Sequence, residues 1–394
     1  MKKIKSQIAI IGGGPSGLML SHMLGLAGID SIVLETRDPD YVVNRLRAGV
    51  LEQTAVDLIN QVGLGERMAK IGLKQRCIEF RFDQEARPID FHDLTEGRCT
   101  MVYPQNEVMS DLIEAHKKNQ KEIWFHSEVN KINHDFDKPI INFNRHGEEY
   151  ELTADFVVGC DGFHGISRAS MPAEFIGNCD YQYGVAWLGI LAQAAPATNH
   201  VVYGCHESGF AMMSIRSPEV TRLYLQCDPR EDIHQWSDAR IWEALHQRLD
   251  VPQRLSINEG VILQKTSTVM RSFMVNSMQY KKMFLVGDAA HIVPPPGAKG
   301  LNSAFADVAV LFRGLSDFYK RDSEDLLRRY SQIALRRMWL VQRFSNGLCN
   351  MIHQYDHHSV FEKKKQLADL RYMTTTEQGR LDFSLNFTGL PINF

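Results

Sequence analysis

A glycine-rich turn near the start of the chain limits the possible fold more than any other feature. The residues GGGPSG at 12–17 follow a β-branched apolar run and open a segment with helical apolar spacing at 15–28. A second strand-like run, SIVLE at 31–35, comes next. This order predicts a strand–helix–strand unit, in which the missing β-carbons let the backbone and the start of the helix approach a pyrophosphate.

An acidic residue completes this pattern. Glu35 ends the second predicted strand, 18 residues after Gly17, where a carboxylate can accept a hydrogen bond from a ribose hydroxyl. An acid at this position indicates an unphosphorylated adenosine ribose, as in FAD or NAD, and a chance glycine turn is the alternative. We therefore predict a dinucleotide site with the candidate contacts Gly12, Gly14, Ser16, Gly17 and Glu35.

Length, charge and cysteine content restrict the possible classes of protein. The 394 residues predict two domains, or one large domain with an added lobe. The 44 basic and 47 acidic side chains give a net charge of −3 without a basic block, so nucleic acid is not an expected partner. No apolar run is long enough to cross a bilayer, so we expect a cytoplasmic protein without a membrane partner. The seven cysteines lack metal-ligand spacing, and we predict reduced thiols and no metal site.

Two kinds of pattern divide the chain. In the first 180 residues strand-like runs alternate with helical ones, and another buried strand is predicted at 154–159. From about 181 to 269 short strand-like runs follow one another, with one helical segment at 238–248. Long amphipathic helices are predicted at 298–356. The sequence therefore indicates an α/β chain with a Rossmann-like unit, a sheet-rich second lobe and a helical carboxyl-terminal region.

A stiff connection follows the strand-like run at 282–287. The stretch GDAAHIVPPPGAKGLN at 287–302 joins this strand to a helix through three prolines and three glycines. Asp288 can accept a hydrogen bond from a polyol, and the free amides at the start of the helix can face the polar edge of a flavin. A structural turn with Asp288 as a helix cap is the alternative.

Three motifs in this order resemble the fingerprints of the single-component FAD-dependent aromatic hydroxylases: GxGxxG at 12–17, GCDGFHGISR at 159–168 and GDAAHIVPP at 287–295. The resemblance covers essentially the whole chain and includes VYPQNEV at 102–108 and GFAMMSIRS at 209–217. It implies a glutathione-reductase-type domain that holds FAD, with NADPH or NADH as a co-substrate that has no such unit of its own.

The resemblance also implies how the chain is divided and assembled. It implies a homodimer in which each chain has a discontinuous FAD-binding domain, at 1–70, 99–180 and 270–394. The substrate-binding domain is then formed by 71–98 and 181–269.

Roles at individual positions follow from the resemblance. Further FAD contacts fall on Arg47, Gln105, Asp288, Lys299, Gly300, Leu301 and Asn302. Contacts to NAD(P)H fall on Arg45, His164, Arg168 and Arg271. Ser214, Arg216 and Tyr224 match the family residues that bind the aromatic carboxylate. Arg222 matches the residue that steers the flavin ring. Tyr203 and the carbonyl of Pro295 match the groups that contact the substrate phenol.

Arg216 has the clearest physical reason among these residues. A guanidinium in an alternating, otherwise apolar strand is costly when buried unpaired, and a benzoate carboxylate is a bidentate partner that suits it. An outward-facing surface arginine is the alternative. Tyr203 and Tyr224 can also be half-buried aromatic residues of a sheet, and His164 and His291 can be structural histidines.

The resemblance implies the reaction as well. The expected activity is hydroxylation of 4-hydroxybenzoate at the 3-position to 3,4-dihydroxybenzoate, with NAD(P)H and O2, through a flavin C4a-hydroperoxide. Tyr203 is expected to donate to the substrate oxygen and to lower the pKa of the phenol, because a phenolate pushes electrons to its ortho carbon. The sequence does not choose between NADPH and NADH.

Three positions depart from the family pattern. Phe387, at a catalytic position, and Gln75 stand where the family has a tyrosine and a histidine that relay the phenol proton, and Pro296 replaces a threonine. The route to solvent thus lacks two of its groups, which leaves 3,4-dihydroxybenzoate or 4-aminobenzoate as alternative substrates. Two alternatives come from other classes: a flavin oxidoreductase without oxygen insertion, and a non-catalytic FAD-binding sensor.

Overall fold

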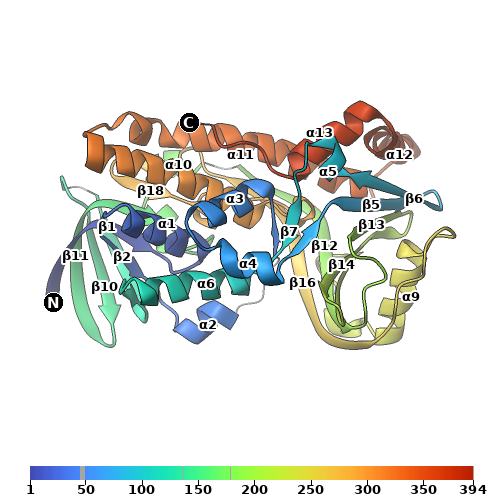
Figure 1. Cartoon of the computed structure of the whole chain (residues 1–394), viewed down its shortest axis with the longest axis horizontal. Helices are drawn as coiled ribbons and strands as arrows, with labels where there is room; N and C mark the ends of the chain where they lie inside the picture. The colour runs from blue at the N-terminus through green and yellow to red at the C-terminus, as the bar shows by residue number, and fades with distance from the viewer. Residues whose placement is uncertain (45–48, 135, 178, 394) are drawn as a thin grey trace.

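The glycine-rich turn follows a central strand of a largely parallel sheet. The computed structural model describes residues 1–44, 49–134, 136–177 and 179–393 (Figure 1). Strand β1, Lys2–Ile11, pairs in parallel with β2, Ser31–Leu34, on one side and with β11, Glu148–Gly159, on the other. Helix α1, Pro15–Leu26, connects β1 to β2 as the apolar pattern predicts.

The first sheet widens on both sides of this unit. Its remaining strands are β8 (Ile123–Trp124), β9 (Ser127–Asn133), β10 (Ile140–Arg145), β17 (Gln279–Tyr280) and β18 (Met283–Leu285). Strand β18 is parallel to β11, so residues near 284 join the same sheet as the first strand, with β11 between them. Helices α1, α6 (Gln105–Lys118) and α10 (Gly300–Arg321) pack with this sheet in one core, where Ile8 and Ile10 are fully buried.

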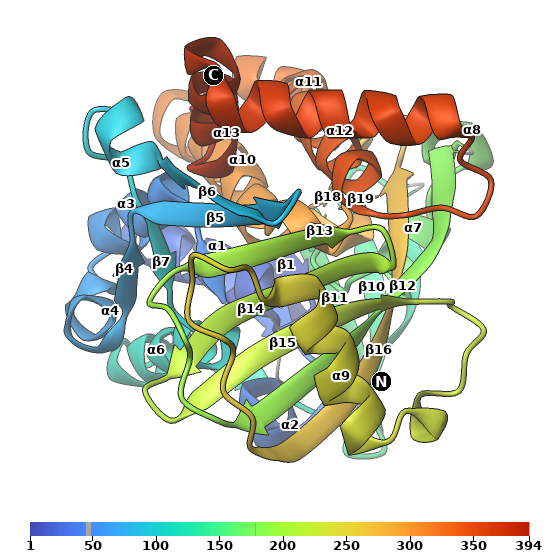
Figure 2. The ribbon, with the colours of Figure 1, turned by 90° about the vertical axis from the view of Figure 1, so that its right-hand side faces the viewer.

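A second, mainly antiparallel sheet forms the other half of the molecule (Figure 2). Its strands are β5 (Cys77–Phe82), β6 (Glu85–Asp90), β12 (Cys179–Gln193), β13 (Val201–His206), β14 (Gly209–Ser217), β15 (Val220–Cys227), β16 (Val261–Met274) and β19 (His291–Ile292). Buried and half-buried residues alternate along β15, as a sheet with two different faces requires. Leu223 and Leu225 pack with α9, Asp238–Leu249, on one face, and Tyr224 lies on the other.

A long helix joins the two halves. The first part of α11, Asp325–Ile352, contributes Tyr330 to the core of the first sheet, and its last part contributes Leu348 to the core of the second (Figure 1). Helices α12, Val360–Thr375, and α13, Glu377–Phe387, follow and cover the second sheet from the same side.

Short elements complete the fold. The strands β3 (Val50–Leu51), β4 (Leu73–Gln75) and β7 (Thr100–Val102) form a small third sheet. The short helices are α2 (Pro39–Asn44), α3 (Gln53–Gln61), α4 (Gly65–Ile71), α5 (Phe91–Leu94), α7 (Ile166–Ala169) and α8 (Ala173–Ile176). In the part of the chain that the structure describes, 3-10 turns lie at Ile233–Gln235, Gly287–Ala289 and Pro295–Gly297. Within the described ranges, no helix is long and apolar enough to cross a membrane.

The predicted fold class is confirmed, and its element ends differ in ways that pairing explains. The apolar run at 7–12 predicts the first strand, and β1 starts earlier, at Lys2, because it pairs with β11 as far as Tyr150. Helix α1 stops at Leu26, two residues early, because Gly28 takes a φ of +74°. The domain boundaries predicted above remain a proposal, which the pairing of β5 with β13 supports.

Candidate active site

The three sequence motifs meet at the carboxyl-terminal edge of the first sheet. The backbone N–H of Cys160 donates to Ile11 at 2.7 Å, and that of Val286 donates to Gly159 at 3.0 Å. A β-carbon at Gly12 would lie 2.4 Å from the carbonyl oxygen of Cys160, so this position requires glycine. Ligands of open α/β sheets bind at this edge.

Two helix starts at this edge have the donors and the space that a dinucleotide needs. Gly14 precedes α1 and Lys299 precedes α10, and neither helix start is capped by a side chain. A β-carbon at Gly14 or at Gly300 would have no heavy atom within 4 Å. Free amides beside open space at a helix start suit a pyrophosphate or the polar edge of a flavin, so the residues present fit FAD.

Glu35 lies where the pattern predicts, at the end of β2. Its carboxylate accepts from the N–H of Gly13 at 2.7 Å and from the N–H of Arg37 at 2.8 Å. The carboxylate is therefore fixed beside the glycine-rich turn. Its contact with a ribose stays a prediction.

The side chains of Lys299 and Asn302 are used within the protein. The buried Lys299 ammonium donates to Glu52 and to the carbonyls of Asn386 and Phe387, at 2.6 and 3.2 Å for the carbonyls. Burial lowers the pKa of Lys299, and the Glu52 carboxylate opposes this. Asn302 bonds Glu52 N–H and the carbonyls of Val50 and Ala298. Any FAD contact at this helix start therefore falls to the backbone of Lys299, Gly300, Leu301 and Asn302.

The half-buried face of the second sheet gathers the predicted substrate residues. Register places Tyr203 opposite Met212, and Met212 opposite Tyr224, so these side chains share one face. Ser214 lies opposite Arg222, whose Nε donates to the Tyr224 hydroxyl at 3.2 Å. Register also places Gly189 of β12 opposite Tyr224, where a β-carbon would come 3.2 Å from that ring.

Arg216 is a half-buried cation at one end of this face. Its Nη2 lies 3.5 Å from Oδ1 of Asn106, and it makes no ion pair with any residue that the structure describes. Burial and the neighbouring Arg222 lower the pKa of Arg216. Asn106 follows Gln105, a predicted FAD contact, at the start of α6. The unpaired guanidinium therefore lies where the substrate sheet meets the FAD-binding half.

Tyr203 joins the same face to the proline-rich loop. Its hydroxyl donates to the carbonyl of Pro296, beside Pro295, at 2.5 Å, and burial raises its pKa. The ring packs edge-on against Phe80 and Phe210, at 5.4 and 5.2 Å between ring centroids. Tyr203 therefore lies at the junction of the second sheet and the loop before α10.

Phe387 lies on the far side of this aromatic group from Tyr203. It stacks on Phe383 at 5.2 Å, and Phe383 in turn meets Phe80, the ring that contacts Tyr203. Gln75 is also buried, and its Nε2 has no hydrogen-bond partner among the described residues. Neither side chain is an acid or a base at neutral pH.

The predicted NAD(P)H residues that are described lie around Phe163. The guanidinium groups of Arg168 and Arg271 lie 4.2 and 4.3 Å from its ring centroid, and the exposed His164 is next in the chain. Arg168 donates to Ala289, which links the second motif to the third, and Arg271 pairs with Asp180. Arg45 and Arg47 lie outside the described residues.

Several site residues were missed from the sequence. They are Asn106, which meets Arg216, Glu52, which pairs with Lys299, and Asp307, which binds the loop of Asp288. Asp307 had a signal, because it is a single acid within the apolar run NSAFADVAVLF. Glu52 and Asn106 stand among other polar residues and had none.

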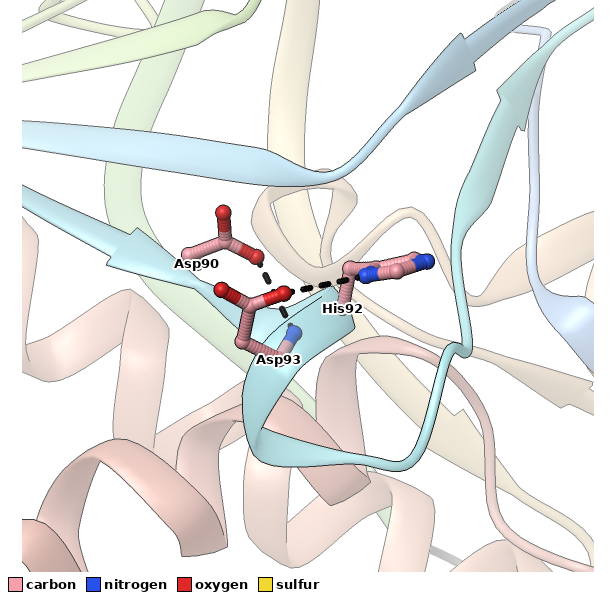
Figure 3. Close-up of side chains that lie close together, drawn as sticks. All are labelled: Asp90, His92 and Asp93. Carbon is pink, nitrogen blue, oxygen red and sulfur yellow. Dashed lines mark hydrogen bonds and ion pairs between the residues drawn. The ribbon is translucent and has the colours of Figure 1, made fainter.

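One group of possible metal ligands lies elsewhere. Asp90, His92 and Asp93 bring their ligand atoms within 4.8 Å of one another at α5 (Figure 3). Asp90 accepts from the N–H of Asp93 as the helix cap, and Asp93 pairs with Arg76 at 3.0 Å. The helix cap and the ion pair explain why these three side chains lie close together.

Comparisons with known proteins place the chain in a family. Residues 5–345 match the family model described as FAD binding domain. The chain belongs to this family and is a flavoprotein of the aromatic hydroxylase class. It is 38% identical over 391 residues to the p-hydroxybenzoate hydroxylase of Acinetobacter baylyi, covering 99% of this chain and 97% of that protein.

More distant relatives agree with this class and fold. The chain is 25% identical to a 3-(3-hydroxy-phenyl)propionate/3-hydroxycinnamic acid hydroxylase of Mycolicibacterium gilvum, over 82% of this chain and 56% of that protein. The p-nitrophenol 4-monooxygenase PnpA of Pseudomonas putida superimposes with a TM-score of 0.84, at 17% identity and with both chains fully covered. The family model and the Acinetobacter relative confirm the predicted FAD cofactor and the predicted enzyme class.

Proposed function

We propose that the protein hydroxylates 4-hydroxybenzoate at the 3-position, giving 3,4-dihydroxybenzoate with consumption of NAD(P)H and O2. The observation that carries this proposal is the half-buried guanidinium of Arg216, which makes no ion pair among the described residues and lies close enough to Arg222 and Tyr224 to interact with them electrostatically. The 38% identity to the Acinetobacter p-hydroxybenzoate hydroxylase along nearly the whole chain supports the same substrate. FAD, held at the starts of α1 and α10, would supply the transfer of hydride from NAD(P)H and the activation of O2.

The protein side chains bind and orient the aromatic acid. Arg216 receives the carboxylate as a charge-assisted pair, with Ser214 and Tyr224 as further partners on the same face. Because a half-buried cation with no ion pair among the described residues is unfavourable, the carboxylate also relieves an electrostatic cost of the free protein. The far end of the ring then points along the sheet face, toward Tyr203.

Tyr203 controls the proton of the substrate phenol. Its hydrogen has two alternative acceptors, the Pro296 carbonyl that it bonds at 2.5 Å and the substrate oxygen. Donation to the substrate oxygen favours the phenolate and so raises the electron density at the ortho carbon. Loss of the relay groups at Phe387 and Gln75 leaves Tyr203 and water to carry the proton outward.

A related substituted benzoate is the second candidate. Phe387 packs among Phe383 and Phe91 and offers no hydrogen-bonding group, which favours rings that need less help with deprotonation, such as 4-aminobenzoate or 3,4-dihydroxybenzoate. We also propose that the protein works as a homodimer, as its resemblance implies, and that it works in the cytoplasm.

Product analysis across a panel of substituted benzoates tests the proposal. The expected result is faster NAD(P)H oxidation with 4-hydroxybenzoate and a matching yield of 3,4-dihydroxybenzoate. Benzoate, which has the carboxylate but no phenol, is the control and should bind without being hydroxylated. Turnover of another ring in preference would establish the second candidate, and NAD(P)H oxidation without any hydroxylated product would contradict both.

A further inference from the structure

One carboxylate oxygen holds both ends of the loop that carries Asp288. Oδ2 of Asp307, on α10, accepts from the backbone N–H of Gly287 at 3.0 Å and from Nε2 of His291 at 2.6 Å. Gly287 and His291 stand on either side of Asp288, at the start and the end of the loop. Asp307 is 2% exposed and His291 is 1% exposed. A single buried atom therefore fixes the distance between the two ends.

The rest of the loop is bonded to its surroundings through the backbone. Ala290 N–H donates to Gly287 at 2.8 Å, and the Ala289 carbonyl accepts from Arg168 at 3.1 Å. Ala289 and Ala290 are fully buried, whereas Asp288 is half-buried. Asp288 is therefore the residue of this loop that keeps access to the neighbouring site.

The position of the loop depends on α10, because the two are closely packed. Gly287 has a φ of +64°, and a β-carbon there would lie 3.0 Å from Cβ of Ala304 and 3.2 Å from Oγ of Ser16. Ala304 and Asp307 are three residues apart and share one face of α10. The loop thus lies between α10 and the start of α1. The starts of these two helices are the ones that fit FAD.

We propose that Asp307 and His291 are positioning residues for FAD. Neither is proposed to touch the cofactor. Asp307 bonds both ends of the loop and so holds Asp288 in place relative to the starts of α1 and α10. This role requires a carboxylate at position 307, because an apolar side chain there could not accept the hydrogen bonds from the Gly287 amide and the His291 imidazole. The inference rests on FAD binding and is independent of which aromatic acid is the substrate.

The test compares FAD affinity with stability in matched variants. Asp307→Ala removes both bonds and should raise the dissociation constant for FAD at least tenfold, measured by flavin fluorescence without any aromatic acid. Asp307→Asn keeps one acceptor oxygen and should give a smaller loss. Tyr330→Phe is the control, since it removes a buried hydrogen bond to Leu285 at 2.7 Å, beside the loop but not across it. It should lower the melting temperature and leave FAD affinity within threefold.

Two results would overturn the proposal. One is an Asp307→Ala protein that is less stable but binds FAD within threefold of the wild type. The other is an equal loss of FAD affinity in Tyr330→Phe, which would make the effect one of general stability. Should Asp307→Ala fail to fold, His291→Ala removes one of the two donors, and the same thresholds apply to it. If the proposed substrate is wrong, the expected changes in FAD affinity still hold, because the measurement contains no aromatic acid.

Discussion

The hydroxyl of Tyr203 donates to the carbonyl of Pro296 at 2.5 Å, across 93 residues of sequence. The bond joins β13, in the sheet that carries Arg216, to the loop that precedes α10. It thereby fixes the predicted phenol end of the substrate site relative to the FAD-binding half.

The first prediction concerns this hydroxyl. Tyr203→Phe leaves a buried carbonyl unpaired and removes the donor to the substrate oxygen, so the bound phenol should ionise at higher pH. We expect the hydroxylation rate to fall on the order of 100-fold while FAD remains bound. Absorbance of enzyme-bound 4-hydroxybenzoate across a pH series measures the shift. An unchanged apparent pKa of the bound phenol would remove Tyr203 from the proposed role.

The second prediction concerns the half-buried cation. Arg216→Ala should weaken binding of 4-hydroxybenzoate roughly 100-fold, equal to about 3 kcal/mol, because the carboxylate loses a charge-assisted partner. Arg216→Lys should recover only part of this, since an ammonium cannot form the bidentate pair. Arg240, an exposed arginine paired with Glu231, is the control, and Arg240→Ala should bind normally. Equilibrium titration of the oxidised enzyme gives all the constants, and equal affinity in both alanine variants would contradict the site.

The third prediction separates two glycines of one motif. In Gly12→Ala the new β-carbon would lie 2.4 Å from the Cys160 carbonyl, so the edge of the sheet must shift. The melting temperature should therefore fall by several degrees. In Gly14→Ala nothing lies within 4 Å of the β-carbon, so the FAD-free protein should keep its stability. The added methyl group would occupy space proposed for FAD, and affinity should fall at least tenfold. Melting temperatures without FAD and FAD titrations check the two effects; normal FAD affinity in Gly14→Ala would place the cofactor elsewhere.

The fourth prediction concerns acid stability. Glu79 is 1% exposed and accepts from Nε of Arg81 and of Arg254, each at 2.8 Å, with His200 at 3.8 Å. Burial alone would raise its pKa, but His200, Arg254 and Arg81 outweigh burial and lower the pKa to about 2. The carboxylate therefore stabilises the fold fully above the unfolded pKa near 4.5, and this is lost as the pH falls toward 2.

Glu79→Gln checks this sign. At pH 7 it should lower the free energy of unfolding by about 3 kcal/mol, and the difference from wild type should shrink below pH 4. Glu85→Gln, which changes an exposed carboxylate that pairs with Arg87 on the same hairpin, should change little at any pH. Urea unfolding at pH 7 and at pH 3.5 gives the comparison. A difference that grows on acidification would show that another group controls acid unfolding.

The local patterns of the sequence predict the fold well where pairing and periodicity agree. Helix α1, strand β2 and helix α9 end within about two residues of their predicted positions because their apolar spacing matches the surfaces they bury. The separate helix α4 and the division of the last helices were not predicted. A φ of +53° at Asp322 ends α10, and no glycine or proline marks that turn.

The site was less predictable than the fold, because side-chain partners come from distant segments. The three motifs follow strands of one parallel sheet, and they meet at one edge because parallel strands end together. Nothing in the sequence indicates that Lys299 uses its ammonium on Glu52 and on two carbonyls near residue 387. Such bonds depend on tertiary geometry, which local spacing does not contain.

The position of α13 has a consequence for how the protein is made. Its residues Phe383 and Phe387 cover rings from β5 and α5, and Lys299 reaches the carbonyls at its end. A ribosome must therefore deliver almost 390 residues before Phe80 and Phe91 are shielded. Until then a nascent chain exposes these rings to solvent, so we expect chaperones to determine how much of the newly synthesised protein escapes aggregation.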